Sequence, residues 1–155
     1  MKARLDPYKA APGTLKAVIA LDDSVQKSGL DPRLMELLKL RASQINGCAY
    51  CVDVHGRGAR SKGENDERLR QLIVWRESPL YTEAERAALA WTEALTLLPD
   101  THAPDDVFEE LRRHFSEEDI VNLTAMIGMI NLWNRVGVGF RLLPSVGSAK
   151  ASAAE

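Results

Sequence analysis

The chain has 155 residues, of which 45% are hydrophobic and 27% are charged, and its formal net charge is -2. This composition is typical of one soluble globular domain, and the nearly balanced charge excludes the strongly basic surface by which proteins bind nucleic acid. No apolar run reaches the ~18 residues of a membrane span, and the N-terminus lacks the apolar stretch of a secretory signal. We therefore expect a cytoplasmic protein with no nucleic-acid or membrane partner, in a compartment that keeps thiols reduced.

Apolar residues recur at helical spacing along the chain, and helix start and stop signals divide the pattern into seven segments. The pair Asp31–Pro32 marks the start of one segment, which should end at Asn46–Gly47. Thr82 and Glu85 form a capping box, and Ser116 caps the last segment. The expected helices cover residues 14–28, 32–45, 48–61, 66–77, 83–98, 104–115 and 117–135.

The last of these segments is apolar around most of its circumference. Such a helix must be covered on several sides, either at the centre of a bundle or at a subunit contact. Asn131, Asn134 and Arg135 interrupt it, and buried polar groups of this kind need hydrogen-bond partners. We expect an all-α, single-domain helical bundle of about seven helices over residues 1–143, followed by a disordered tail over the small polar residues 144–155.

Both cysteines lie in the segment GCAYCVDVH, residues 47–55. On a helix that starts near Cys48, the side chains of Cys48, Cys51 and His55 fall within one arc of roughly 60°. A free thiol has a pKa of ~8.5, so it needs help to become a thiolate at neutral pH. The helix dipole lowers that pKa by less than about one unit, whereas His55, one turn after Cys51, can accept the thiol proton. The histidine therefore favours Cys51 as the reactive sulfur, while the helix start alone favours Cys48.

Two other interpretations of this segment remain open from the residues alone. Buried free cysteines are common and usually inert. Cys48, Cys51 and His55 are also acceptable zinc ligands, but the chain lacks the second ligand pair that structural zinc sites use. We expect no metal and no other cofactor, because the sequence also lacks a nucleotide- or flavin-binding fingerprint. His102 and His114 adjoin predicted helix ends, where capping or surface roles are expected.

Glu36 stands eleven residues before Cys48. Helical periodicity places it roughly opposite Leu34 and Leu38, which predicts a solvated surface residue. The pattern Glu-x11-Cys-Ala-Tyr-Cys-x3-His, however, resembles the signature of the alkylhydroperoxidase D-like proteins, in the peroxidase-related branch of the carboxymuconolactone decarboxylase superfamily. The resemblance is strongest over residues 30–98 and includes the later apolar helix.

This resemblance implies an all-helical fold that assembles into homo-oligomers, commonly trimers or hexamers, and an enzyme that reduces hydroperoxides. By position, Cys51 corresponds to the cysteine that attacks the peroxide and Cys48 to the resolving cysteine, while Glu36 and His55 correspond to a proton relay. A sulfenic acid would condense with the second thiol to a disulfide, which an external dithiol or thiol protein then reduces. Tyr50 stands where well-studied members carry a histidine, and tyrosine is a poor proton shuttle at neutral pH.

Two alternatives to this antioxidant enzyme remain. One is a non-catalytic, oligomeric redox sensor or binding module, in which the disulfide alters packing without peroxide turnover. The other is a lyase of the decarboxylase branch, whose members generally lack the C-x-x-C motif that stands intact in this chain.

Overall fold

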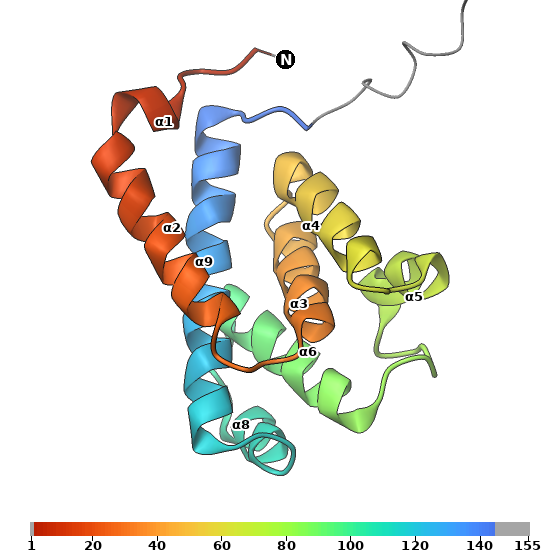
Figure 1. Ribbon diagram of the computed structural model, residues 1–155. Coiled ribbons are helices and arrows are strands. Elements are labelled where there is room, and N and C mark those ends of the chain that lie inside the picture. Colours follow the sequence, from red (N-terminus) through yellow and green to blue (C-terminus); the bar gives the residue numbers. More distant parts are fainter. Residues whose placement is uncertain (1, 145–155) are drawn as a thin grey trace, which may run out of the picture.

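The computed structural model describes residues 2–144 of the chain (Figure 1). Within this range the regular secondary structure is entirely helical, which confirms the predicted all-α fold, with nine α-helices in place of about seven. Apart from Pro144, the predicted tail lies outside the described residues. The elements are α1 (Pro7–Ala10), α2 (Pro12–Gln26), α3 (Pro32–Ile45), α4 (Ala49–Ser61), α5 (Asp66–Gln71), the 3₁₀ helix η1 (Leu72–Val74), α6 (Glu83–Thr96), α7 (Leu98–Thr101), α8 (Asp105–Arg112) and α9 (Glu117–Phe140).

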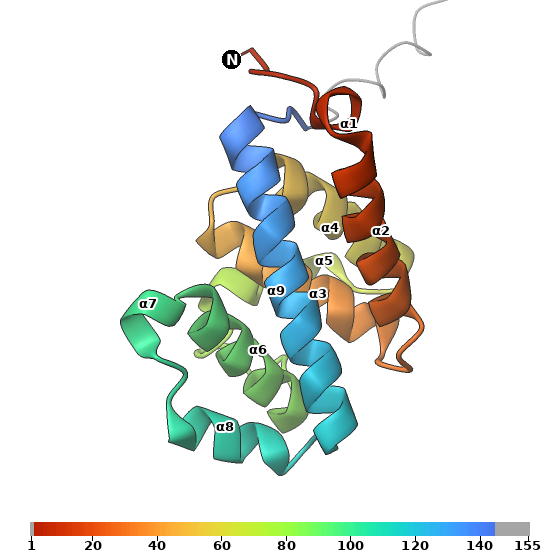
Figure 2. The same ribbon diagram turned by 90° about the vertical axis from the view of Figure 1, so that its left-hand side faces the viewer.

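The long helix α9 is the central element of the bundle. It contacts α2, α3, α4, α6 and α8, and it runs through most of the height of the molecule in both Figure 1 and Figure 2. Its apolar residues Leu123, Met126, Ile127 and Ile130 are buried, which confirms that this helix is covered on several sides. None of the helices in residues 2–144 combines the length and the apolar character needed to cross a membrane.

The polar residues of α9 find the partners that the sequence requires. Asn46, at the end of α3, donates hydrogen bonds to the side-chain oxygens of Asn131 and Asn134, at 2.9 and 2.8 Å. Asn131 also donates to Thr96 of α6 at 3.1 Å, and Asn134 donates to Ser43 of α3 at 3.0 Å. These bonds satisfy buried amides and hold the end of α3 against α9.

Most of the predicted helix starts are confirmed. Asp31 and Ser116 accept hydrogen bonds from backbone N–H groups in the first turns of α3 and α9, and Pro32 occupies the first position of α3. The capping box of Thr82 and Glu85 is present at the start of α6. These caps satisfy N–H groups that have no partner within the helix.

The helix predicted over residues 66–77 is wrong in its second half. It ends after the six residues of α5 and passes through η1 into turns. Arg86 of α6 donates hydrogen bonds to the carbonyl oxygens of Trp75 and Ser78, at 3.0 and 3.2 Å. These bonds give the carbonyl oxygens of the turns after η1 partners outside a regular α-helix.

Other helix boundaries also differ from the prediction. The helix predicted over residues 83–98 divides into α6 and the single turn α7, and α8 ends before residue 115. The sequence signals do not predict the single turn α1, in which Asp6 is the N-cap and Pro7 the first residue. At the other end of the chain, α9 continues five residues beyond the predicted end at 135.

Candidate active site

The candidate site forms where the turn between α3 and α4 meets α9. Gly47 completes this turn with a φ of 66°, a conformation that glycine adopts without steric penalty. Cys48 follows as the N-cap of α4, and its Sγ accepts a hydrogen bond from the backbone N–H of Cys51 at 3.3 Å. The two cysteines form a disulfide with their Cα atoms 5.3 Å apart. Both residues are buried, Cys48 at 1% and Cys51 at 4% exposure.

The backbone of α9 covers the disulfide at Gly137. A Cβ atom at this position would lie 2.7 Å from Cys48 Sγ and 3.3 Å from Cys51 Sγ, closer than side chains pack. One turn earlier, the carbonyl oxygen of Trp133 lies 4.0 Å from Cys51 Sγ. Only a residue without a side chain therefore lets α9 approach the sulfurs this closely.

Glu36 of α3 and His55 of α4 face each other across the helix pair. The Nδ1 atom of His55 lies 2.9 Å from Glu36 Oε2, within hydrogen-bond distance. When Nδ1 carries a proton, Glu36 accepts it as a hydrogen bond, and Nε2 of the neutral ring is free to accept another. Gly58 makes room for the carboxyl group, because a Cβ there would lie 2.9 Å from Glu36 Cδ.

The prediction from periodicity that Glu36 is a solvated surface residue is wrong. Its side chain is only 14% exposed. The helix α3 packs against α4, α6 and α9, so more than one of its faces is buried. The structure places Glu36 beside His55, the two residues that the family resemblance implies as a proton relay.

A buried lysine extends this pair into a chain of charged groups. Lys39 Nζ lies 3.2 Å from Asp22 Oδ1 and 3.9 Å from Glu36 Oε1, and the lysine side chain is only 2% exposed. A buried ammonium group is stable only when it is paired, and Lys39 has an anion on each side. Lys39 is not among the residues predicted for the site, although a lysine within the run Leu-Leu-Lys-Leu is a signal of a buried charge.

One cavity, of about 160 Å³, gives access to Cys51, and we name it the Cys51 cavity. Asp22 contributes a carboxylate, His55 an imidazole, and Tyr8 and Tyr50 contribute hydroxyl groups. Its complete lining is Tyr8, Asp22, Tyr50, Cys51, Val54, His55, Trp133 and Leu142. The cavity therefore combines a sulfur of the disulfide, an imidazole and three aromatic side chains.

Tyr8 places the N-terminal segment at the wall of the Cys51 cavity. Its ring stacks on the indole of Trp133, with centroids 6.4 Å apart and planes inclined by 26°. Burial raises the pKa of the Tyr8 hydroxyl, and repulsion from Tyr50 and Asp6 adds to the effect. The phenol therefore stays protonated at neutral pH and can donate a hydrogen bond into the cavity.

The other histidines lie on the surface, as the sequence predicts. His102 is exposed and follows α7 in the left-handed conformation, with a φ of 53°. His114 is exposed, and its Nε2 lies 3.1 Å from Glu110 Oε1. Among the described residues, no group of three or more histidine, cysteine, aspartate or glutamate side chains is arranged to hold a metal ion.

Known protein sequences assign the chain to a family. The sequence model described as the Carboxymuconolactone decarboxylase family matches residues 12–94. A relative from Bacillus subtilis (strain 168), the uncharacterized protein YdfG, is 37% identical over 138 residues, which are 89% of this chain and 94% of YdfG. The chain belongs to the carboxymuconolactone decarboxylase family. This confirms the resemblance drawn from the Glu-x11-Cys-x2-Cys-x3-His signature.

Solved structures of similar proteins have the same fold as this chain. One, from Agrobacterium tumefaciens, is a protein of unknown function described as a candidate antioxidant defence protein AhpD. It is 53% identical, with a TM-score of 0.92 over 94% of this chain and 100% of that chain. The debrominase Bmp8 is 25% identical, with a TM-score of 0.80 over 89% of this chain and 74% of Bmp8. These two proteins are named for different kinds of chemistry. The shared fold therefore does not by itself assign a reaction to this chain.

Replacing Gly137 with alanine should destabilise the oxidised protein. The new methyl group would lie 2.7 Å from Cys48 Sγ, and neither the disulfide nor the helix backbone can move away freely. We expect a loss of about 1–3 kcal/mol in the free energy of unfolding, measured by denaturant titration. Gly128→Ala is the control on the same helix, because a Cβ there meets nothing within 4 Å. Equal effects of the two substitutions would contradict the close approach at Gly137.

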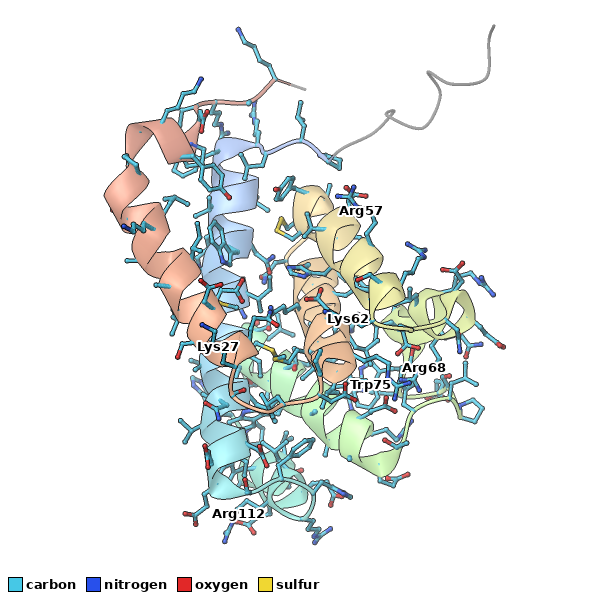
Figure 3. All side chains as sticks on the ribbon, viewed as in Figure 1. Lys27, Arg57, Lys62, Arg68, Trp75 and Arg112 are labelled. Carbon is cyan, nitrogen blue, oxygen red and sulfur yellow. A yellow bond between two sulfur atoms is a disulfide. The ribbon has the colours of Figure 1, made fainter. Side chains whose placement is uncertain are left out.

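Replacing Lys39 with methionine should leave two carboxylates without their shared cation. We expect the free energy of unfolding to fall by about 2–4 kcal/mol, somewhat below the value for a fully buried pair because Asp22 is partly exposed. Lys27→Met is the control, since Lys27 is exposed at the end of α2 (Figure 3). A Lys39→Met variant as stable as the control would show that the buried charges do not depend on one another.

Proposed function

We propose that this protein is a thiol-dependent peroxidase that reduces hydroperoxides with Cys51 as the attacking cysteine, Cys48 as the resolving cysteine, and His55 and Glu36 as the proton relay. The observation that carries the proposal is that Cys51 and His55 line one cavity while Cys48 is bonded to Cys51. The hydrogen bond between His55 and Glu36 supports the relay, because it orients the imidazole.

The proposed reaction begins with the reduced cysteine pair. Nε2 of His55 accepts the Cys51 proton, and Glu36 stabilises the imidazolium that forms. The Cys51 thiolate attacks the terminal oxygen of the hydroperoxide, the O–O bond breaks, and the alcohol leaves after taking up a proton. Cys48 then attacks the Cys51 sulfenic acid, and water leaves as the disulfide forms. An external thiol reductant returns two electrons and two protons to the pair.

The assignment of Cys51, rather than Cys48, as the attacking residue is supported by the cavity. Cys51 lines the space that also contains His55, whereas Cys48 is not part of its lining. The position of Cys48 at the N-cap stabilises a thiolate only modestly, by about 0.3–1 kcal/mol at exposed sites. A base that accepts the proton contributes more, typically a factor of about 10²–10⁴ in rate.

We also propose that the protein forms a homo-oligomer, as the family resemblance implies. Several large apolar side chains are exposed on the described surface of the single chain, among them Ile73, Val74 and Val121. Burial of such residues against a second copy would remove apolar surface from water. Their exposure supports an interface between copies.

The first test is hydroperoxide consumption with excess dithiothreitol in two cysteine variants. We expect Cys51→Ser to abolish turnover, because the attacking sulfur is gone. Pre-reduced Cys48→Ser, assayed after dithiothreitol is removed, should consume about one equivalent of hydroperoxide per chain and form no internal disulfide, because a sulfenic acid still forms on Cys51. Turnover that survives in Cys51→Ser would contradict the mechanism. A disulfide that forms stoichiometrically in wild type without turnover would favour the redox sensor.

A second test addresses the proton relay. We expect His55→Gln to slow oxidation by hydroperoxide by about 10²-fold at neutral pH, because the thiol loses its base. The loss should shrink as the pH rises through the ordinary thiol range, since Cys51 then ionises without help. His114→Gln, at an exposed histidine, is the control. A uniform loss at every pH would instead indicate that His55 acts through packing.

Reductive debromination is a second candidate reaction, and the aromatic wall of the Cys51 cavity favours it. Tyr8, Tyr50 and Trp133 line the cavity and suit a flat aromatic ring. The debrominase Bmp8 shares the fold. Two thiols and an aryl bromide would give the disulfide, the debrominated ring and hydrogen bromide, so the electrons balance. Bromide release from a brominated aromatic compound, against hydroperoxide consumption under the same conditions, distinguishes the two reactions.

A further inference from the structure

A second cavity reaches the disulfide from another direction. It has a volume of about 360 Å³, and its lining includes Cys48 but not Cys51, so we name it the Cys48 cavity. The Cys51 cavity has the opposite composition. Tyr50 and Leu142 line both cavities, so the two spaces lie next to each other. Each of the two cavities is therefore lined by a different cysteine of the disulfide.

The two cavities also differ in charge. Arg4 and Arg141 line the Cys48 cavity, and both are exposed to solvent. Arg4 is held in place, because its guanidinium donates a hydrogen bond to the carbonyl oxygen of Gly139 at 2.8 Å. Within residues 2–144, neither arginine forms an ion pair with an acidic side chain, and no acidic residue lines this cavity. The charged and titratable groups of the Cys51 cavity are instead Asp22 and His55 with two tyrosines.

We propose that the Cys48 cavity binds the reductant, and that the reductant is a small thiol compound with a carboxylate or similar anionic group near its thiol. This assignment rests on the proposed function in one respect: the disulfide must form during turnover for a reductant to act on it. The volume lies within the ~300–1,000 Å³ range of small-molecule sites. Cys48 is only 1% exposed, so a slender molecule reaches its sulfur more easily than the flat face of a protein does.

The chemistry requires attack on Cys48. The incoming thiolate bonds to Cys48 Sγ, the bond between the two cysteines breaks, and its electron pair leaves on Cys51 Sγ. Cys51 is the better leaving group because His55 can supply its proton, and thiols of low pKa leave faster. A second thiol, on the same or another molecule, then attacks the ligand's sulfur and releases Cys48, which takes up a proton. Two thiols become one disulfide, and the cysteine pair gains two electrons and two protons.

The two arginines would act on this step in two ways. Their positive charge attracts an anionic ligand and raises its concentration at the cavity. The same charge stabilises the thiolate form of the attacking group. A neutral thiol benefits only from the second effect. A preference for anionic over neutral reductants is therefore the property to measure.

The test uses the oxidised protein without hydroperoxide, so it does not depend on peroxidase activity. Reduction is followed by stopped-flow with 3-mercaptopropionate and with its uncharged methyl ester. Each rate is divided by the rate of the same thiol with a small disulfide in solution, which removes differences in intrinsic reactivity. We expect the anionic thiol to be favoured about tenfold at low ionic strength. The preference should disappear at 1 M salt, where the screening length is ~3 Å.

Charge variants show whether the arginines cause the preference. The double substitution Arg4→Gln and Arg141→Gln should remove it. The control is Arg112→Gln, on α8, at the opposite end of the molecule from the C-terminal end of α9 (Figure 3). Wild-type protein without any anionic preference, or a double variant that keeps it, would overturn the proposal. The proposal would also be overturned if a thioredoxin-type protein reduced the disulfide faster than the small anionic thiol does, at a rate that does not change when both arginines are replaced.

A steric variant separates the two cavities. A Cβ at Gly139 meets nothing within 4 Å, and Gly139 lines the Cys48 cavity, so Gly139→Leu adds bulk beside this cavity without a clash at the Cβ. We expect reduction by 3-mercaptopropionate to slow at least about tenfold, while oxidation of the reduced variant by hydroperoxide changes less than about twofold. Equal slowing of both half-reactions would overturn the assignment of separate cavities. If wild-type protein is reduced as expected but never oxidised by hydroperoxide, the proposed peroxidase function fails and the reductant site stands.

Discussion

The contact between α9 and the turn that joins α3 to α4 is the interaction on which the rest of the site depends. Asn46 holds this turn to α9 through hydrogen bonds to Asn131 and Asn134. One turn beyond Asn134, the missing side chain of Gly137 lets the helix backbone cover both sulfurs. The hydrogen bonds of Asn46 and the close approach of the helix backbone at Gly137 thus act together. They fix the start of α4 relative to α9, which covers it.

Both ends of the described chain contribute to the walls of the two cavities, beside residues of the segment that matches the family. Glu36, His55 and both cysteines lie within residues 12–94, the segment that matches the family. Tyr8 and Arg4 precede this segment, while Trp133 and Arg141 follow it, and these four residues line the two cavities. The cysteine pair, Glu36 and His55 therefore lie within the segment that matches the family, whereas residues from both ends of the described chain complete the walls of the two cavities.

The helical fold and most helix starts could be predicted, because caps and apolar periodicity are local signals. The grouping of the cysteines with His55 could also be predicted, since all three lie on one helix. The burial of Glu36 could not be derived from periodicity, because α3 is packed on more than one face. Lys39 and Gly137 escaped prediction for a related reason: their roles depend on contacts with other helices, which residue spacing along one helix does not encode.

The most direct test of the account is to count thiols in the reduced native protein before and after one equivalent of hydroperoxide. The chain has two cysteines, so the measurement has no background from other thiols. If Cys51 is oxidised and Cys48 captures the product, both thiols disappear together and return on addition of a thiol reductant. If the thiol count stays unchanged while the protein remains folded, the pair does not react with hydroperoxide and the central claim is wrong.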